Sequence, residues 1–276
     1  MRLLLVASVV ALALFNASGS GSATRPNGMI AFSDRIYYTG DDSWEILVVR
    51  PDGTGKRRLT HVGKQLFDSV EPTWSPSGRR IAFTSHSGIF VMDANGQRVR
   101  RLTNREGDDA PAWSPQRDRI AFVRDNGIWT MRANGTHQRR LTQARGEDSP
   151  AWAPDGRRIV YVRDRTHGLW LIGSRRGPAH SLSLRGSNPS WSPDGHRIVF
   201  ERASHEVETA GIFVVRPDGS GLRRLTCCGD DPVWSPDGRK IAYRGGGIRV
   251  MDANGGHQHV VVSGFEEMVG PAWGVG

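Results

Sequence analysis

Short apolar runs alternate with polar positions along this chain, and turns containing Gly or Pro interrupt them at regular intervals. One apolar triplet recurs: IAF at 30, 81 and 120, IVY at 159, IVF at 198 and IAY at 241. A second apolar run follows most of these triplets, for example IFVMD or IRVMD. Runs of this length, rich in β-branched and aromatic residues and bounded by turns, indicate strands. The pattern predicts an all-β protein.

A repeated tryptophan sets the period of the pattern. The repeat positions are Trp74, Trp113, Trp152, Trp191, Trp234 and Trp273, spaced 39, 39, 39, 43 and 39 residues apart. The first five are followed by tight turns, such as SPDG, in which Pro presets φ and Asp-Gly supplies an acceptor and a positive φ. Each unit is interpreted as four short strands, and such units bury both faces only when stacked around an axis. We predict a six-bladed β-propeller of four-stranded blades, with the tryptophans packed between blades.

The two chain ends complement each other. The first triplet, in NGMIAF, has no Trp strand before it, and the last Trp, in GPAWG, has no triplet after it. Pairing of the N- and C-terminal strands would complete one blade, close the ring and leave no open sheet edge.

These repeat residues also support a family resemblance. VWSPDGRKIAY, together with IRVMDANG and the recurring LT, resembles the Trp-Ser-Pro-Asp-Gly (WD40-like) propeller repeat of the TolB-like superfamily. The resemblance covers nearly all of the chain after its first 23 residues. It implies an envelope or extracellular binding propeller. The α/β domain that precedes the propeller in TolB is not expected here, because the first repeat follows the apolar N-terminus directly.

The N-terminus has the pattern of a secretory signal peptide. Arg2 is followed by an apolar run from Leu3 to Phe15 and by small polar residues up to Ala23. This run is shorter than the roughly 20 residues that a membrane-spanning helix needs. We expect residues 1–23 to be a signal peptide, residues 24–276 to be the propeller, and the mature chain to be secreted or periplasmic without a transmembrane segment.

The net charge of +9 is almost all arginine and recurs with the repeat. Because the basic residues form neither one patch nor one stripe, we expect no nucleic-acid partner. The arginines of the recurring RRLT segments are expected to be solvated charges on the outermost strands, where they discourage edge-to-edge association.

One end of the predicted ring is plain and the other is elaborated. Short turns gather at the first end, whereas the long connections 33–44, 61–71 and 201–211 gather at the second. Variable loops on a repeated scaffold are usual seats of binding. Acids precede the innermost strands there and are expected near the channel mouth: Asp68, Glu71, Asp108, Asp109, Glu147, Asp148, Asp230, Asp231, Glu266 and Glu267.

Two interpretations of these acids stay open. They could hold a cation such as Ca²⁺ or a basic peptide, because hard cations take several oxygen ligands. Alternatively, they cap loops by accepting backbone N–H groups and pair with Arg124, Arg163 and Arg202. Outside the repeat, Tyr37, Tyr38 and Trp44 are further candidates for ligand or partner contact.

Function is predicted as non-enzymatic binding of a protein or cell-envelope component through the elaborated end. No zinc-protease, nucleophile-elbow or phosphate-loop motif occurs in the repeats. The alternatives are a metal-dependent hydrolase or lactonase-like site at the channel mouth, and a TolB relative that binds an envelope lipoprotein.

The chain's two cysteines, Cys227 and Cys228, are adjacent and fall in a connection at the elaborated end. They can bridge within the chain only to each other. Adjacent Cα atoms lie about 3.8 Å apart across a trans peptide, which is below the usual disulfide range, so such a bridge would be strained. Both a vicinal disulfide and two free thiols are considered.

Overall fold

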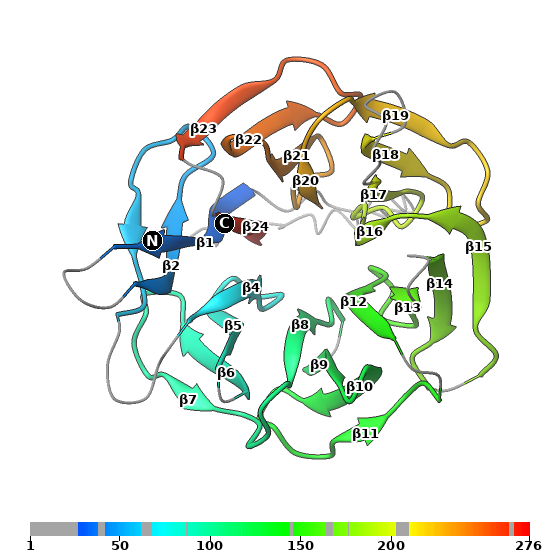
Figure 1. Cartoon of the computed structure of the whole chain (residues 1–276), viewed down its shortest axis with the longest axis horizontal. Coiled ribbons are helices and arrows are strands. Elements are labelled where there is room, and N and C mark those ends of the chain that lie inside the picture. Colours follow the sequence, from blue (N-terminus) through cyan, green and yellow to red (C-terminus); the bar gives the residue numbers. More distant parts are fainter. Residues whose placement is uncertain are drawn as a thin grey trace, which may run out of the picture.

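The computed structural model describes residues 27–276 except 38–41, 62–67, 87, 117, 144–145, 164–167, 176, 203–209 and 265–267. The predicted signal peptide therefore lies outside the described residues. The described residues form six four-stranded antiparallel sheets arranged as blades around a central channel (Figure 1). No helix that could cross a membrane occurs in this described part. The predicted all-β six-bladed propeller is confirmed.

Each blade runs outward from an innermost strand beside the channel. The innermost strands are β4 (Val70–Trp74), β8 (Asp109–Trp113), β12 (Glu147–Trp152), β16 (Ser187–Trp191), β20 (Asp230–Trp234) and β24 (Val269–Val275). The second strands are β1 (Asn27–Ile36), β5 (Arg80–Ser85), β9 (Arg119–Arg124), β13 (Arg158–Arg163), β17 (Ile198–Arg202) and β21 (Lys240–Arg244). The third strands are β2 (Ser43–Val49), β6 (Gly88–Asp93), β10 (Gly127–Arg132), β14 (Gly168–Gly173), β18 (Gly211–Val215) and β22 (Gly247–Asp252). The outermost strands are β3 (Arg57–Arg58), β7 (Arg100–Arg101), β11 (Arg139–Arg140), β15 (His180–Arg185), β19 (Arg223–Thr226) and β23 (His259–Ser263).

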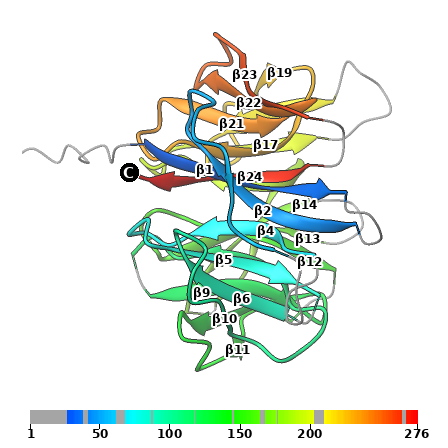
Figure 2. The same cartoon turned by 90° about the vertical axis from the view of Figure 1, so that its left-hand side faces the viewer.

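The chain ends close the ring as predicted. Strand β24 pairs antiparallel with β1, with Ile30 opposite Trp273 and Ala31 opposite Ala272. The two strands lie side by side in both views of the molecule (Figures 1 and 2). The last strand in the sequence is therefore the innermost strand of the first blade.

The turn after each innermost tryptophan is held by its own side chains. In the sixth blade the carboxylate of Asp237 accepts hydrogen bonds from Ser235 Oγ at 2.6 Å and from Arg239 N at 3.0 Å. Gly238 has a φ of +71°, a region that favours glycine. The Ser-Pro-Asp-Gly sequence therefore fixes the reversal that returns the chain into the second strand.

The hydrophobic core is formed by side chains that pack between neighbouring blades. The apolar triplets of the second strands are buried, and the side chains of Ile81, Ala82 and Phe83 are fully so. Five of the six repeat tryptophans are also buried, and Trp74 is half-buried. The arginine after the turn stacks on the tryptophan of the next blade, as Arg80 does on Trp113 with its guanidinium carbon 5.2 Å from the ring centroid. Such cation–π contacts favour Arg over a neutral residue at this repeat position.

The first arginine of each RRLT segment also joins neighbouring blades. Arg57 donates to Ala94 O, Arg100 to Ala133 O, Arg139 to Ser174 O and Arg223 to Asn254 O, over 2.8–3.2 Å. The acceptor in each case belongs to a turn of the next blade. These arginines are exposed on the outermost strands, as expected, and each also repeats one hydrogen bond from blade to blade.

Candidate functional site

The central channel has two chemically different ends. Figure 2 views the ring from the side, with the C-terminus at one end of the channel. The innermost strands finish at this end with the repeat tryptophans and the Ser-Pro-Asp-Gly turns, so we call it the turn end. The opposite end, where the innermost strands begin and the long connections lie, is called the loop end.

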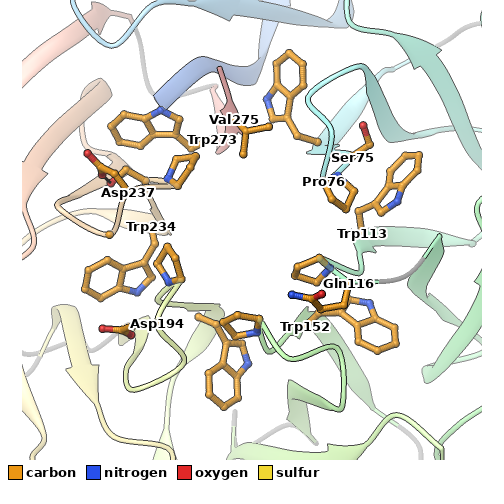
Figure 3. Close-up of a pocket in the computed structure, with 18 residues that line it drawn as sticks. Ser75, Pro76, Trp113, Gln116, Trp152, Asp194, Trp234, Asp237, Trp273 and Val275 are labelled. Carbon is orange, nitrogen blue, oxygen red and sulfur yellow. Dashed lines mark hydrogen bonds between the residues drawn. The ribbon is translucent and has the colours of Figure 1, made fainter. Parts of the chain in front are cut away.

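A cavity of about 460 Å³ opens at the turn end. Its lining includes all six repeat tryptophans and the residue two positions after each of them. Those second residues are Pro76, Pro115, Pro154, Pro193, Pro236 and Val275. Figure 3 shows the indoles of Trp113, Trp152, Trp234 and Trp273 pointing outward, while Pro76 and Val275 lie closer to the opening. The tryptophans thus pack between blades as predicted, and their edges also bound a mostly apolar cavity.

Sequence reasoning missed this cavity. The Trp-x-Pro spacing was visible, but it was interpreted only as turn chemistry. Whether six such turns leave an opening depends on the diameter of the ring, which no single repeat contains.

At the loop end, a belt of equivalent residues surrounds the channel. The belt position lies three residues before each repeat tryptophan and comprises Glu71, Ala110, Ser149, Asn188, Asp231 and Gly270. The five non-glycine members have φ between +46° and +53°. In each of these five blades the pairing of the innermost and second strands shifts register at this position. A bulge that re-aims side chains is a recurrent device at functional sites.

Hydrogen bonds connect the belt from blade to blade. Ala110 N donates to Glu71 Oε2 at 2.8 Å. Further round the ring, Ser149 Oγ donates to Asn188 Oδ1 at 3.0 Å, and Asn188 Nδ2 donates to Asp231 Oδ1 at 2.5 Å. The belt therefore fixes its side chains against one another across blade boundaries.

The predicted acid pairs divide between two roles. One acid of a pair turns into its own blade: Asp108 is fully buried and accepts two hydrogen bonds of 2.6 Å from Arg124. Glu147 likewise accepts from Thr142 Oγ1 and lies 4.0 Å from Arg163 Nε. These contacts match the loop-capping and arginine-pairing interpretation for Asp108 and Glu147.

Among the described residues, the second acid of the same pairs has no ion pair with an arginine. Asp109 has a buried carboxylate oxygen, Oδ1, without a hydrogen-bond partner among the described residues. Asp148 is exposed and accepts a hydrogen bond from Ser149 N at 2.6 Å. In the sixth blade Arg244 contacts both acids, Asp230 at 3.0 Å and Asp231 at 3.1 Å.

Burial and neighbouring charges raise the pKa of two carboxyls of the loop end. Burial raises the pKa of Asp109 to about 7, and the charges of Glu71 and Asp148 add to the shift. Burial also raises the pKa of Glu71, with the charges of Asp148 and Asp231 as further causes. Because these acids belong to four different blades, the charges act across the channel. A like-charge group of this kind is stabilised by a cation or by protonation.

Other predicted residues are placed differently. Asp68 is exposed and accepts a hydrogen bond of 3.2 Å from the backbone N of Trp44. Tyr37 is 65% exposed, with the Arg35 guanidinium 5.5 Å from its ring centroid. Tyr38, Glu266 and Glu267 lie outside the described residues. In the described part of the chain, Arg202 Nε donates to Arg185 O at 3.3 Å, and its pairing with an acid stays a prediction.

Glu201 is an acid of this end that sequence reasoning missed. It is half-buried on β17, and its Oε2 accepts a hydrogen bond of 2.5 Å from Asp231 N. Burial raises its pKa to about 7, with the charge of Asp231 as the next cause. A signal existed: Glu201 is the one acid that directly follows an apolar triplet.

Cys227 and Cys228 lie in the connection between β19 and β20, as predicted. Both are exposed free thiols, and their sulfur atoms are 3.0 Å apart. The hydrogen bond from the Cys228 thiol lowers the pKa of Cys227.

In the described part of the chain, no three His, Cys, Asp or Glu side chains are grouped closely enough to hold a metal ion. The expected Ca²⁺ at the channel mouth therefore stays a prediction.

Comparison with known proteins places the chain in a family. The family model of the TolB beta propeller domain matches residues 11–174, more than half of the sequence. The chain belongs to this TolB propeller family. A search of curated proteins found no match.

Solved structures of TolB have the same fold as this family member. TolB from Acinetobacter baumannii is 21% identical, with a TM-score of 0.77 over 90% of this chain and 66% of its own. A putative TolB from Agrobacterium tumefaciens is 19% identical, with a TM-score of 0.69 over 91% of both chains. A chain of a Nidogen/Laminin complex is 10% identical, with a TM-score of 0.72 over 90% of this chain and 99% of its own. At these identities the likeness is one of fold.

Proposed function

We propose that this protein is an exported, non-enzymatic binding propeller that recognises a protein or cell-envelope component through its loop end. The export part of the proposal rests on residues 1–23, which have the composition of a signal peptide. The binding part rests on the acids around the channel. The two parts are independent, and each has its own test.

The observation that carries the binding proposal is the gathering of carboxyls from different blades, whose charges add to burial in raising the pKa of Asp109 and Glu71. Burial raises the pKa of Asp109 and of Glu71, and charges from other blades add to both shifts: Glu71 and Asp148 for Asp109, and Asp148 and Asp231 for Glu71. The net charge of the whole chain is nevertheless +9. A bound positive group would relieve this repulsion and would gain attraction from several carboxylates at once. The partner surface is therefore expected to present Lys or Arg side chains.

A defined peptide tests the binding proposal. The full chain is titrated into a fluorescent tri-lysine peptide with blocked termini, and binding is followed by anisotropy at pH 8 and low salt. The double variant Asp109→Asn/Asp148→Asn is expected to bind about fivefold more weakly, which corresponds to roughly 0.5 kcal/mol for each of the two lost charge pairs. Asp125→Asn is the matched control, because Asp125 lies at the same end and its side chain is 54% exposed.

The pH dependence sharpens this experiment. Affinity is expected to fall from pH 8 to pH 5, because Asp109 and Glu201, with pKa values of about 7, become protonated and lose their charge. Equal binding by wild type and the double variant would refute the loop-end proposal, as would equal binding of a tri-glutamate peptide. Calcium chloride that displaces the peptide at millimolar concentration or below would instead favour the predicted cation.

Export is tested by expressing the full chain in a bacterium that secretes proteins. Mass spectrometry of the recovered protein should give a mature N-terminus close to residue 24. Retention of residues 1–23 on a cytoplasmic product would contradict the export proposal and would leave the binding result unaffected.

A further inference from the structure

The adjacent cysteines form a feature that the binding function does not use. Cys227 and Cys228 occupy the connection from the outermost strand of the fifth blade to the innermost strand of the sixth. Both side chains are exposed, and the two sulfur atoms are 3.0 Å apart. Two soft donors are therefore presented together to solvent.

Two glycines allow the backbone around the pair to pack closely. Gly211 has a φ of +124°, and a methyl group on it would collide with Thr226 O and lie 3.1 Å from Cys227 Cα. Gly229 has a φ of +115°, and a methyl group on it would lie 2.6 Å from the Tyr243 ring. Side chains at these two positions would push the connection away from the blades. The glycines thus let the connection that carries the thiols pack closely against the blades.

Adjacent cysteines suit a shared metal ion better than a bond to each other. A disulfide usually joins Cα atoms at least about 4.4 Å apart, whereas Cα atoms across a trans peptide are about 3.8 Å apart. The described residues contain no cis peptide bond. Metal–sulfur bonds are about 2.3 Å long. Two thiolate sulfurs on one ion are therefore roughly 3.8 Å apart in tetrahedral geometry and roughly 4.6 Å apart in linear geometry. The sulfur atoms are 3.0 Å apart and both side chains are exposed, so a small increase in their separation would give this spacing.

We propose that Cys227 and Cys228 form a two-thiolate site for copper(I). Soft thiolate ligands favour Cu(I) and zinc over harder cations. Structural zinc sites take four protein ligands, and no third His, Cys, Asp or Glu side chain is grouped with these two in the described part of the chain. An ion that is satisfied by two soft donors fits this ligand set.

The binding step is a ligand exchange without electron transfer. Two S–H bonds break, both protons pass to solvent, and two Cu–S bonds form, which leaves the bis-thiolate complex with one negative charge. Arg224 lies beside the site, and its guanidinium donates to Cys227 O at 3.4 Å. Its positive charge compensates that of the complex.

The test is an anaerobic competition with the reduced full chain. Cu(I) is supplied as its complex with bicinchoninate, a coloured chelator, and its transfer to the protein is read from the loss of colour. We expect one Cu(I) per chain, with at least tenfold weaker binding in each of Cys227→Ser and Cys228→Ser. The control variant His257→Ala/His259→Ala removes the two closely spaced histidines of the next blade and should bind as tightly as wild type.

A thiol assay separates the remaining outcomes. Two thiols per chain should react with Ellman's reagent in the reduced apo-protein, and both should be protected after copper loading. Copper retained by the Cys227→Ser/Cys228→Ser double variant would overturn the proposal, as would tighter uptake of zinc than of Cu(I). Loss of both thiols in air, together with no copper uptake by the reduced chain, would assign the pair to a vicinal disulfide instead.

Discussion

The guanidinium of Arg124 holds the carboxylate of Asp108 through two hydrogen bonds of 2.6 Å, and both side chains are buried. Arg124→Ala would leave this carboxylate uncompensated inside the third blade. Breaking a buried ion pair by removing one partner costs about 3–5 kcal/mol. We expect a loss of this size in the free energy of unfolding, measured by urea denaturation at pH 7.

The exposed pair of Arg105 and Asp125 is the control for this prediction. Its atoms are 3.1 Å apart, but the side chains are 57% and 54% exposed. Arg105→Ala is therefore expected to cost less than about 1 kcal/mol. Similar losses for the two variants would contradict the assignment of Arg124 as a structural partner inside the blade.

Gly274→Ala tests how tightly the chain ends close the ring. Gly274 lies on β24 of the first blade, and a methyl group on it would lie 2.7 Å from the indole of Trp74 in the second blade. Overpacking of this kind costs about 1–3 kcal/mol. The fall should appear in the free energy of unfolding.

Gly256→Ala is the matched control for Gly274→Ala. The nearest atom to an added methyl group there is Asn254 Oδ1, at 3.1 Å, in an exposed turn. Its free energy of unfolding is expected to change by less than about 0.5 kcal/mol. A wild-type stability for Gly274→Ala would mean that the first and second blades do not pack closely here.

The fold could be predicted from the sequence because each repeat contains the residues that form its own strands and turns. Trp234, the turn after it and the IAY triplet specify one blade, and six copies specify the ring. The closure by β24 and β1 followed from the offset between Trp273 and the first triplet. The repeat pattern and the number of its copies can both be read from the amino-acid sequence.

The candidate site could be predicted only in outline. Asp108 and Asp109 are adjacent acids, and the sequence does not say which one meets Arg124 and which one faces the other blades. The direction of each acid is set by the bulge beside it, in which Ala110 has a φ of +46°. The residue types of the repeat do not require a bulge at this position. The partner of Asp231, Asn188, is 43 residues away. Relations between blades depend on the assembled ring.

Asp109→Asn is expected to stabilise the protein at pH 8 and to have a much smaller effect at pH 4. The pKa of Asp109 is raised from 3.8 to about 7, first by burial and then by Glu71 and Asp148. Between these two values the native state binds more protons than the unfolded chain, so stability falls as pH rises. Above pH 7 both states are ionised and the native state carries the whole penalty, which Asn removes. Urea denaturation of both proteins at the two pH values measures the difference.

The same ionisation can be observed directly by carbon-13 NMR of the side-chain carboxyls. Asp109 and Glu201 should titrate with midpoints of about 7, because both are shifted by burial and by neighbouring acids. Asp125→Asn serves as the stability control, since its exposed side chain should change unfolding by less than about 0.5 kcal/mol. Midpoints near 4 for both acids, with a pH-independent effect of Asp109→Asn, would show that the loop-end carboxyls do not repel one another. The basis for a positively charged partner would then be lost.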